Sequence, residues 1–298
     1  MPNTALPLFY FVVIVMENKD IEYFNRLWDD SKPKDGMVHN KETWDRMAHA
    51  WGADSPKVKL KKDEKILKIC EYLNSKDLLK DKTILDLGCG PGKYGIEFAK
   101  TAKFVTLSDV SSVMLEYAEN NAKEIGVSNL EYVEADFLTQ SVSELSWEKK
   151  FDLVFTSLTP AMDSAESIEK INATSKDWAF NNSFVYLRDS LKDEVKENVF
   201  GVKPNENWGN SSPYCIFNIL WLMGLHPEVT YYSDVLDYEY ELRESTALTV
   251  VENIIRDRAP TDDEVKAVFE YLSSKYKDGK VPRHTESMYS WILWNVNG

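Results

Sequence analysis

The segment Thr83–Gly95, TILDLGCGPGKYG, decides the fold class of this 298-residue chain. An apolar stretch runs into Asp86, and three glycines follow at Gly88, Gly90 and Gly92 before apolar residues return with helical spacing. Glycines allow a turn with positive φ and let a ligand approach the backbone closely. The first turn of the next helix offers unpaired N–H groups to an anion. The segment therefore predicts a strand, a ligand-binding turn and a helix.

Short apolar runs alternate with helical periods after this segment, which is typical of βα units and a mostly parallel sheet. Ser111 can cap one of the helices, and residues 261–264, TDDE, form a capping box before another. The predicted fold class is α/β with a seven-stranded, mostly parallel sheet. Its strands are expected at 83–87, 104–108, 131–134, 151–157, 178–187, 229–242 and 287–296.

The chain is expected to form two parts. Residues 1–80 are interpreted as an N-terminal arm and a helical cap over the carboxyl ends of the strands, and residues 81–298 as the sheet domain. The stretch 188–212 is polar and interrupted by glycine and proline, so we interpret it as an insertion in that domain.

Residues 6–16, LPLFYFVVIVM, form an apolar run near the N-terminus. The run is too short to span a bilayer and lacks the basic start of a signal peptide. We interpret it as a short strand, a packing arm or a start of translation placed too early, and a membrane anchor is the less favoured alternative.

Two classes of ligand use a glycine turn of this kind. Residues 90–95 match the dinucleotide pattern GxGxxG, so NAD is one candidate. The carboxylate of Asp86 precedes the glycines, where it would repel a pyrophosphate and attract an ammonium group. S-adenosylmethionine (SAM) has an ammonium group for Asp86 and a carboxylate for the amides of the turn. The charge pattern therefore favours SAM.

Residues 86–92, DLGCGPG, resemble the glycine-rich motif of class I SAM-dependent methyltransferases. The resemblance implies a Rossmann-like methyltransferase sheet with SAM as the cofactor. It also implies that Asp109, 21 residues after Gly88, holds the ribose hydroxyls, and that strand 151–157 ends beneath the transferable methyl. The implied cofactor-binding residues are Asp86, Gly88, Cys89, Gly90, Gly92, Asp109, Val110, Met114, Asp136, Phe137 and Ser157.

The sequence also bears on the methyl acceptor. Residues 157–160 read Ser-Leu-Thr-Pro and differ from the Asn/Asp-Pro-Pro-Tyr/Phe motif of enzymes that methylate amino groups of DNA bases. The formal net charge of −14 disfavours contact with phosphates. We therefore expect a small-molecule acceptor, no nucleic acid and no membrane partner. The expected acceptor-binding residues are His39, Trp44, Thr159 and Asp163.

The three cysteines and four histidines show no metal-ligand spacing and no disulfide pattern, so no metal is expected and a cytoplasmic location is favoured. Cys89 is interpreted as a small residue that fits the turn. The predicted reaction is in-line methyl transfer, in which positioning supplies much of the rate and no catalytic base is assigned. Two alternatives stay open: a SAM-binding regulator or pseudoenzyme without turnover, and an NAD-dependent oxidoreductase.

Overall fold

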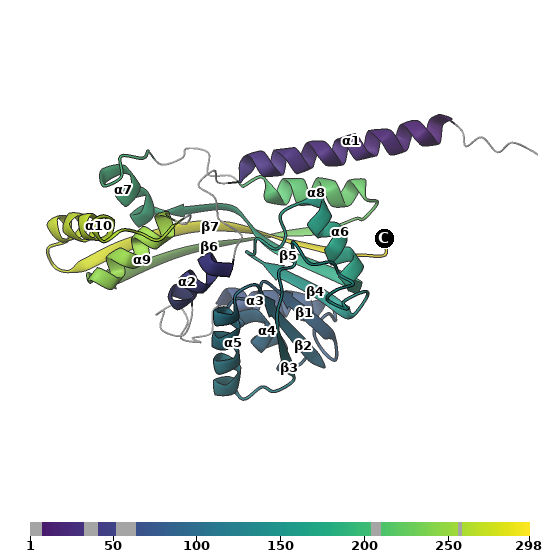
Figure 1. Cartoon of the computed structure of the whole chain (residues 1–298), viewed down its shortest axis with the longest axis horizontal. Helices are drawn as coiled ribbons and strands as arrows, with labels where there is room; N and C mark the ends of the chain where they lie inside the picture. Colours follow the sequence, from purple (N-terminus) through teal and green to yellow (C-terminus); the bar gives the residue numbers. More distant parts are fainter. Residues whose placement is uncertain (1–7, 33–40, 52–63, 204–209, 256–257) are drawn as a thin grey trace, which may run out of the picture.

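The computed structural model describes residues 8–32, 41–51, 64–203, 210–255 and 258–298 (Figure 1). Its centre is a seven-stranded sheet in the order β3-β2-β1-β4-β5-β7-β6. Neighbouring strands from β3 to β5 are parallel, and β7 runs antiparallel to both β5 and β6. The strands are β1 Thr83–Leu87, β2 Phe104–Asp109, β3 Leu130–Glu134, β4 Phe151–Ser157, β5 Ser175–Asp189, β6 Glu228–Glu241 and β7 Lys280–Asn295.

The predicted α/β fold with a mostly parallel sheet is confirmed, and each predicted strand is present. β5 and β7 are longer than predicted: they pair with each other from Trp178↔Asn295 to Asp189↔Thr285, and β7 continues along β6 to the pair Glu241↔Lys280. Their far ends extend beyond the carboxyl end of β4, whose last registered pair with β5 is Ser157↔Asn182. The carboxyl edge of the parallel strands therefore lies beside a three-stranded extension.

Helices cover both faces of the sheet (Figure 1). Strand residues alternate between two hydrophobic clusters, as Ile84 and Leu85 show. The face that packs against α3, α4 and α5 is called the α3 face, and the face that packs against α6 and α8 is called the α8 face. The helices are α1 Leu8–Ser31, α2 Lys41–Trp51, α3 Glu64–Ser75, α4 Lys93–Phe98, α5 Ser112–Ile125, α6 Ala165–Thr174, α7 Ser190–Asn198, α8 Ser212–Leu222, α9 Glu244–Ile254 and α10 Asp262–Lys275.

The apolar N-terminal run belongs to a helix from Leu8 onward, so its interpretation as a short strand is wrong. Helix α1 continues to Ser31 and lies along α8 (Figure 1). Ile21, Phe24 and Trp28 repeat with helical spacing and pack onto the α8-face cluster, which explains why the helix persists. Among the described residues, no helix is long and apolar enough to cross a membrane.

The three N-terminal helices occupy different places. Helix α2 reaches the carboxyl edge of the sheet, where it contacts α5. Helix α3 packs against a face of the sheet instead, because Ile69 and Leu73 are fully buried in the α3-face cluster. The expected cap over the strand ends is therefore wrong for α3.

The stretch 188–212, interpreted as a polar insertion, contains regular secondary structure in its described part. The described part of this stretch completes β5 and forms α7, and it also contains the start of α8. Leu191 and Val195 of α7 are buried in a third hydrophobic cluster with α9, α10 and Val281 of β7. We call this unit the outer lobe: α7, α9 and α10 with the adjoining ends of β5, β6 and β7.

A buried ion pair ties the outer lobe together. Nε of Arg283 on β7 lies 3.0 Å from both carboxylate oxygens of Asp189 on β5, and its Nη1 donates to the hydroxyl of Tyr240 on β6 at 2.8 Å. Asp189 also accepts a hydrogen bond from the backbone of Lys192 and caps α7. Asp189 and Arg283 together therefore join the three strands to α7.

We predict that Asp189→Ala lowers the free energy of unfolding by about 3–5 kcal/mol, because Arg283 is left buried without its counter-ion. Chemical denaturation followed by circular dichroism measures this loss. The matched control is Lys280→Ala, which removes an exposed ion pair with Glu239 in the same lobe and is expected to leave stability unchanged. Equal effects of the two substitutions would contradict the assignment.

Candidate functional site

The glycine turn between β1 and α4 is held against β2 by its backbone. The N–H groups of Gly88 and Cys89 both donate to the carbonyl oxygen of Ser108, at 2.8 and 2.9 Å. The N–H of Gly90 donates to Oδ2 of Asp109 at 2.8 Å. The turn is therefore fixed in place by the end of the neighbouring strand.

Two glycines of the turn have no room for a side chain. Gly88 has φ +69°, and a Cβ atom there would lie 1.9 Å from Oγ1 of Thr159. Gly92 has φ +79°, and a Cβ atom there would lie 3.0 Å from Ala118 of α5. The contact at Gly88 brings the predicted cofactor turn together with Thr159, a predicted acceptor residue in the loop after β4.

Asp86 lies on the α3 face at the end of β1 and is almost fully buried. Its Oδ2 accepts a hydrogen bond from the N–H of Gly95 in α4 at 2.9 Å. Burial raises the pKa of this carboxyl to about 7, since it outweighs the Gly95 hydrogen bond, and the negative charge of Asp109 adds to the rise. The carboxyl is therefore placed to respond strongly to a nearby cation.

Both oxygens of Asp109 accept backbone hydrogen bonds at the end of β2. Oδ2 bonds to Gly90, and Oδ1 accepts from the N–H of Ser111 at 2.9 Å. Burial raises the pKa of this carboxyl as well, and the N–H donors oppose the rise. Val110 is partly exposed beside it, and Met114 is buried in the first turn of α5. The structure thus places Asp109, Val110 and Met114, three of the predicted cofactor-binding residues, close together along the chain at the end of β2 and the start of α5.

Asp45 of α2 joins this group and was missed by the sequence analysis. The hydroxyl of Ser111 accepts from the N–H of Met114 at 3.1 Å and donates to Oδ1 of Asp45 at 2.5 Å. Lys41, also on α2, forms an ion pair with Glu134 at the end of β3. Helix α2 is therefore fastened to the ends of two strands, a pairing that no sequence pattern indicated.

The predicted cofactor residues that follow β3, Asp136 and Phe137, contact residues outside the glycine turn. Asp136 accepts from the N–H groups of Leu138 and Thr139, at 3.2 and 3.4 Å, and so caps the turn that follows β3. Phe137 is buried in the α8-face cluster, where its ring stacks on Trp147 with centroids 6.3 Å apart. The side chain of Phe137 therefore lies in the core, apart from the group around the glycine turn.

The end of β4 has an unusual backbone. Oγ of Ser157 accepts a hydrogen bond from Nδ2 of Asn182 on β5 at 2.8 Å. The next residue, Leu158, has φ 52° and a side chain 41% exposed. Its N–H donates to the carbonyl oxygen of Asn182 at 2.9 Å. Left-handed conformations cost a leucine free energy and often mark functional sites.

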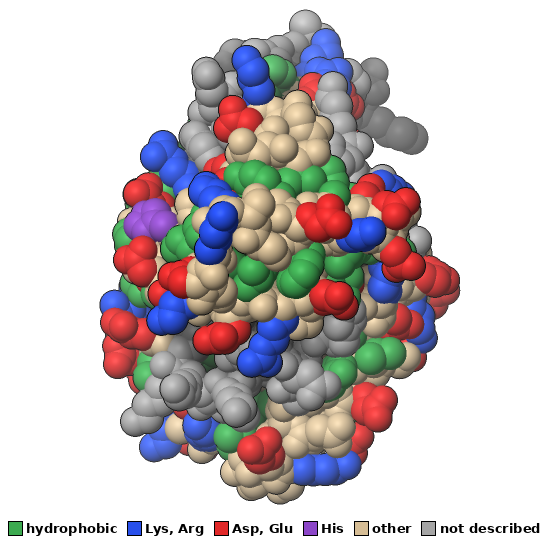
Figure 2. All heavy atoms as spheres, turned by 90° about the vertical axis from the view of Figure 1, so that its left-hand side faces the viewer, with side chains coloured by type: hydrophobic (Ala, Val, Ile, Leu, Met, Phe, Trp, Pro, Cys, Tyr) green, Lys and Arg blue, Asp and Glu red, His purple; other side chains and the backbone are tan. Residues whose placement is uncertain are grey.

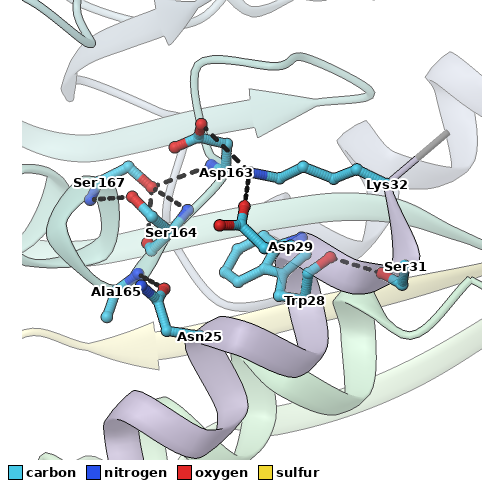
Figure 3. Close-up of polar contacts among 9 residues, drawn as sticks. All are labelled: Asn25, Trp28, Asp29, Ser31, Lys32, Asp163, Ser164, Ala165 and Ser167. Atoms are coloured by element: carbon cyan, nitrogen blue, oxygen red, sulfur yellow. Dashed lines mark hydrogen bonds and ion pairs between the residues drawn. The ribbon is translucent and has the colours of Figure 1, made fainter. Parts of the chain in front are cut away.

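Figure 3 shows how α1 holds the loop that follows. Nζ of Lys32 lies 2.6 Å from Asp29 and 3.5 Å from Oδ2 of Asp163, and Oδ1 of Asn25 accepts from the N–H of Ala165 at 2.8 Å. Asp163 also lines a hollow of about 190 Å³ beside α6. Asp163 is therefore tied to α1 and α6, apart from the glycine turn.

The remaining predicted residues have simple placements. Trp44 lies on α2 and is partly buried, and His39 lies outside the described residues. Burial raises the pKa of the Cys89 thiol well above its usual range, which keeps the thiol neutral. Within the described parts of the chain, no group of three His, Cys, Asp or Glu side chains is arranged to hold a metal ion.

Part of this chain is similar in sequence to known methyltransferases. Residues 78–207 match the family model described as a methyltransferase domain. Two curated 23S rRNA (uracil(1939)-C(5))-methyltransferases, from Aeromonas hydrophila and Alcanivorax borkumensis, are each 32% identical to this chain, over 116 and 117 residues. These matches cover 37% and 38% of this chain and 26% of each relative, so the chain matches about a quarter of their length.

Two solved structures align with more of the chain, at low identity. The YcgJ protein from Bacillus subtilis is 15% identical with a TM-score of 0.48, over 78% of this chain and 97% of its own. A putative methyltransferase from Bacillus halodurans is 16% identical with a TM-score of 0.47, over 78% and 99%. The family match spans the glycine turn and the ends of β1, β2 and β4 described above. Over residues 78–207, this chain is therefore similar to a methyltransferase domain.

Proposed function

We propose that this chain transfers the methyl group of SAM to a small molecule bound at the carboxyl ends of β4 and β5. The observation that carries the proposal is a pair of carboxylates, Asp86 and Asp109, each fixed by backbone N–H groups at the ends of adjacent strands. In this assignment Asp109 holds the ribose hydroxyls and Asp86 faces the ammonium of the methionine part.

Electrostatics favours SAM over a dinucleotide at this place. Asp45, Asp86 and Asp109 put three carboxyl groups near one turn. The charge of Asp109 raises the pKa of Asp86, and the charge of Asp45 raises the pKa of Asp109. SAM has a sulfonium and an ammonium group, whereas NAD has an anionic pyrophosphate. Because like charges repel most strongly where water is scarce, these three carboxyl groups together favour the cationic ligand.

The order of strands sets the direction from which the acceptor approaches. The proposed cofactor residues lie on β1 and β2, and β4 borders β1 on the other side. The acceptor then reaches the methyl from β4 and β5, beside Ser157 and Thr159. Its lone pair forms the new bond to the methyl carbon while the C–S bond breaks and its electron pair stays on sulfur, which yields S-adenosylhomocysteine (SAH). Positioning supplies much of the rate in such a displacement.

Ribosomal RNA is the second candidate acceptor, since the two curated relatives are rRNA methyltransferases. The charge of the chain speaks for a small molecule. The net charge is −14, and acidic and basic side chains are interspersed on the outer-lobe end of the molecule that Figure 2 shows. RNA-binding surfaces gather basic residues in one place.

Asp86 predicts a pH dependence of ligand binding. Its pKa of about 7 means that part of the carboxyl is protonated at neutral pH, whereas an ammonium ligand binds the ionised form. We expect SAH affinity to rise between pH 5.5 and 8, by at most about tenfold per pH unit, and to level off above the pKa. Calorimetry across this range measures it. Asp86→Asn is expected to bind weakly with a shallower profile, because Asp109 still titrates, and an unchanged slope in that variant would refute the assignment.

Asp109 predicts cofactor selectivity. We expect the protein to bind SAH and not NAD, and Asp109→Ala to weaken SAH binding by about 1.5–3 kcal/mol through lost charge-assisted hydrogen bonds. The matched control is Asp152→Ala, because Asp152 also accepts a backbone hydrogen bond, from Thr83, but does so where β1 and β4 begin. Binding of NAD, or equal losses in the two variants, would contradict the proposal.

The acceptor class is tested by turnover. SAH formation from SAM is measured with a library of neutral and cationic metabolites and, separately, with transcribed 23S rRNA fragments, using Asp109→Ala as the inactive control. We expect turnover with a small molecule only. Turnover with the RNA alone would overturn the small-molecule assignment, and SAH binding without any turnover would favour a regulator or pseudoenzyme.

A further inference from the structure

Two buried polar atoms on neighbouring strands have no hydrogen-bond partner among the described residues: Oδ1 of Asn182 on β5 and Nε1 of Trp291 on β7. The side chain of Asn182 is fully buried, and Trp291 is 5% exposed. One atom is an acceptor and the other is a donor. Since burying a polar atom without a partner costs free energy, each requires an explanation.

The two residues lie side by side. Asn182 and Trp291 are direct cross-strand partners in the antiparallel pair of β5 and β7. Side chains at such positions point to the same face, with Cβ atoms about 4.5–5.5 Å apart. Trp291 and Phe180, two residues before Asn182, both belong to the α3-face cluster, so the unpaired donor and acceptor share that face.

The pair continues the row of proposed site residues across the sheet. Phe155 and Leu107 belong to the same cluster, so Ser157 and Asp109, two residues further along β4 and β2, also point to the α3 face. Nδ2 of Asn182 donates to Oγ of Ser157, whose hydroxyl proton is then free to point elsewhere. Asn182 and Trp291 therefore lie level with Ser157, the last residue of β4, on the side from which the acceptor is proposed to approach.

Similar side chains elsewhere in the sheet are satisfied. Asn181, on the opposite face, donates to Oγ1 of Thr156 at 3.0 Å and accepts from the hydroxyl of Ser183. Nε1 of Trp294, also on β7, donates to Oδ1 of Asn172 at 2.8 Å. One buried side-chain oxygen also lacks a hydrogen-bond partner among the described residues in each of Ser108, Thr174, Ser211 and Glu252. Asn182 and Trp291, however, are the cross-strand pair in which an unpaired acceptor and an unpaired donor lie side by side. A local cost in stability is expected of a functional site.

The surroundings restrict what can bind there. The rings of Tyr72, Tyr232 and Phe180 lie 5.4, 5.7 and 6.5 Å from the ring of Trp291. A charged group would lose its hydration in this aromatic environment without gaining a counter-ion from the pair. A neutral group that both accepts and donates one hydrogen bond would satisfy Nε1 and Oδ1 together.

We propose that Asn182 and Trp291 form a subsite for a neutral amide or hydroxyl group of the methyl acceptor. This proposal rests on the proposed function. This group of the substrate receives a hydrogen bond from Nε1 of Trp291 and donates one to Oδ1 of Asn182. The subsite recognises acceptors by this paired group and lies next to the position of the transferable methyl.

The first test compares two tryptophans. Trp291→Phe removes an unpaired donor, whereas Trp294→Phe breaks an existing hydrogen bond at an equally buried position of the same strand. We expect Trp294→Phe to lower the melting temperature of the ligand-free protein by several degrees more than Trp291→Phe does. Equal losses would mean that Nε1 of Trp291 already has a partner, such as a buried water, and would overturn the proposal.

The second test uses small neutral probes. Indole N–H resonances of ¹⁵N-tryptophan-labelled protein are recorded with saturating SAH, and the Trp291 signal is assigned by its loss in Trp291→Phe. Titration with acetamide is expected to shift this signal saturably, leave the Trp294 signal in place, and have no effect in Asn182→Leu. Acetate and methylammonium serve as charged controls.

The outcomes separate the two proposals. A Trp291 signal that does not move with acetamide, or that moves equally with acetate, refutes the subsite while SAH binding stands. Failure to bind SAH at all refutes the proposed function, and the melting comparison of the two tryptophan variants still tests whether Nε1 is unpaired.

Discussion

The site depends on one constraint: the backbone of the glycine turn is bound by the end of β2 before any ligand arrives. The carbonyl oxygen of Ser108 accepts hydrogen bonds from two N–H groups of the turn, and the carboxylate of Asp109 accepts one from a third. The turn in turn holds Asp109 in place, so the proposed ribose-binding carboxylate is preorganised. A side chain at Gly88 would collide with Thr159, so the same constraint fixes how closely the loop after β4 approaches.

The sheet could be predicted because its signals are local. The strands β1, β2 and β4 are short, largely apolar runs, and the Asp86–Gly92 motif is continuous in sequence. The outer lobe depends on pairs that are far apart, such as Arg283 and Asp189, 94 residues from each other. Leu191 and Val195 stand in a polar stretch, and only the packing of α9 and α10 makes them core residues.

The same distinction applies to the candidate site. Asp86 and Asp109 follow from the motif and its spacing, and the structure brings them together. Asp45 and Asn182 were missed because their roles come from the docking of α2 and from the register of β5, neither of which a single sequence displays. Phe137 shows the converse case, since a motif gives the position of a residue in the chain and not the direction of its side chain.

The features around the end of β4 share a physical character, because each lowers stability. Asp86 is a buried carboxyl with a raised pKa, Leu158 has a left-handed backbone, and Asn182 and Trp291 have unpaired atoms. They adjoin a rigid aromatic layer in which the rings of Phe155 and Phe180 stack 5.2 Å apart. The apolar area that this layer buries offsets the local loss of stability. Its low polarity strengthens the electrostatic interactions and hydrogen bonds beside it. A ligand that satisfies these groups therefore gains more here than it would at an exposed surface.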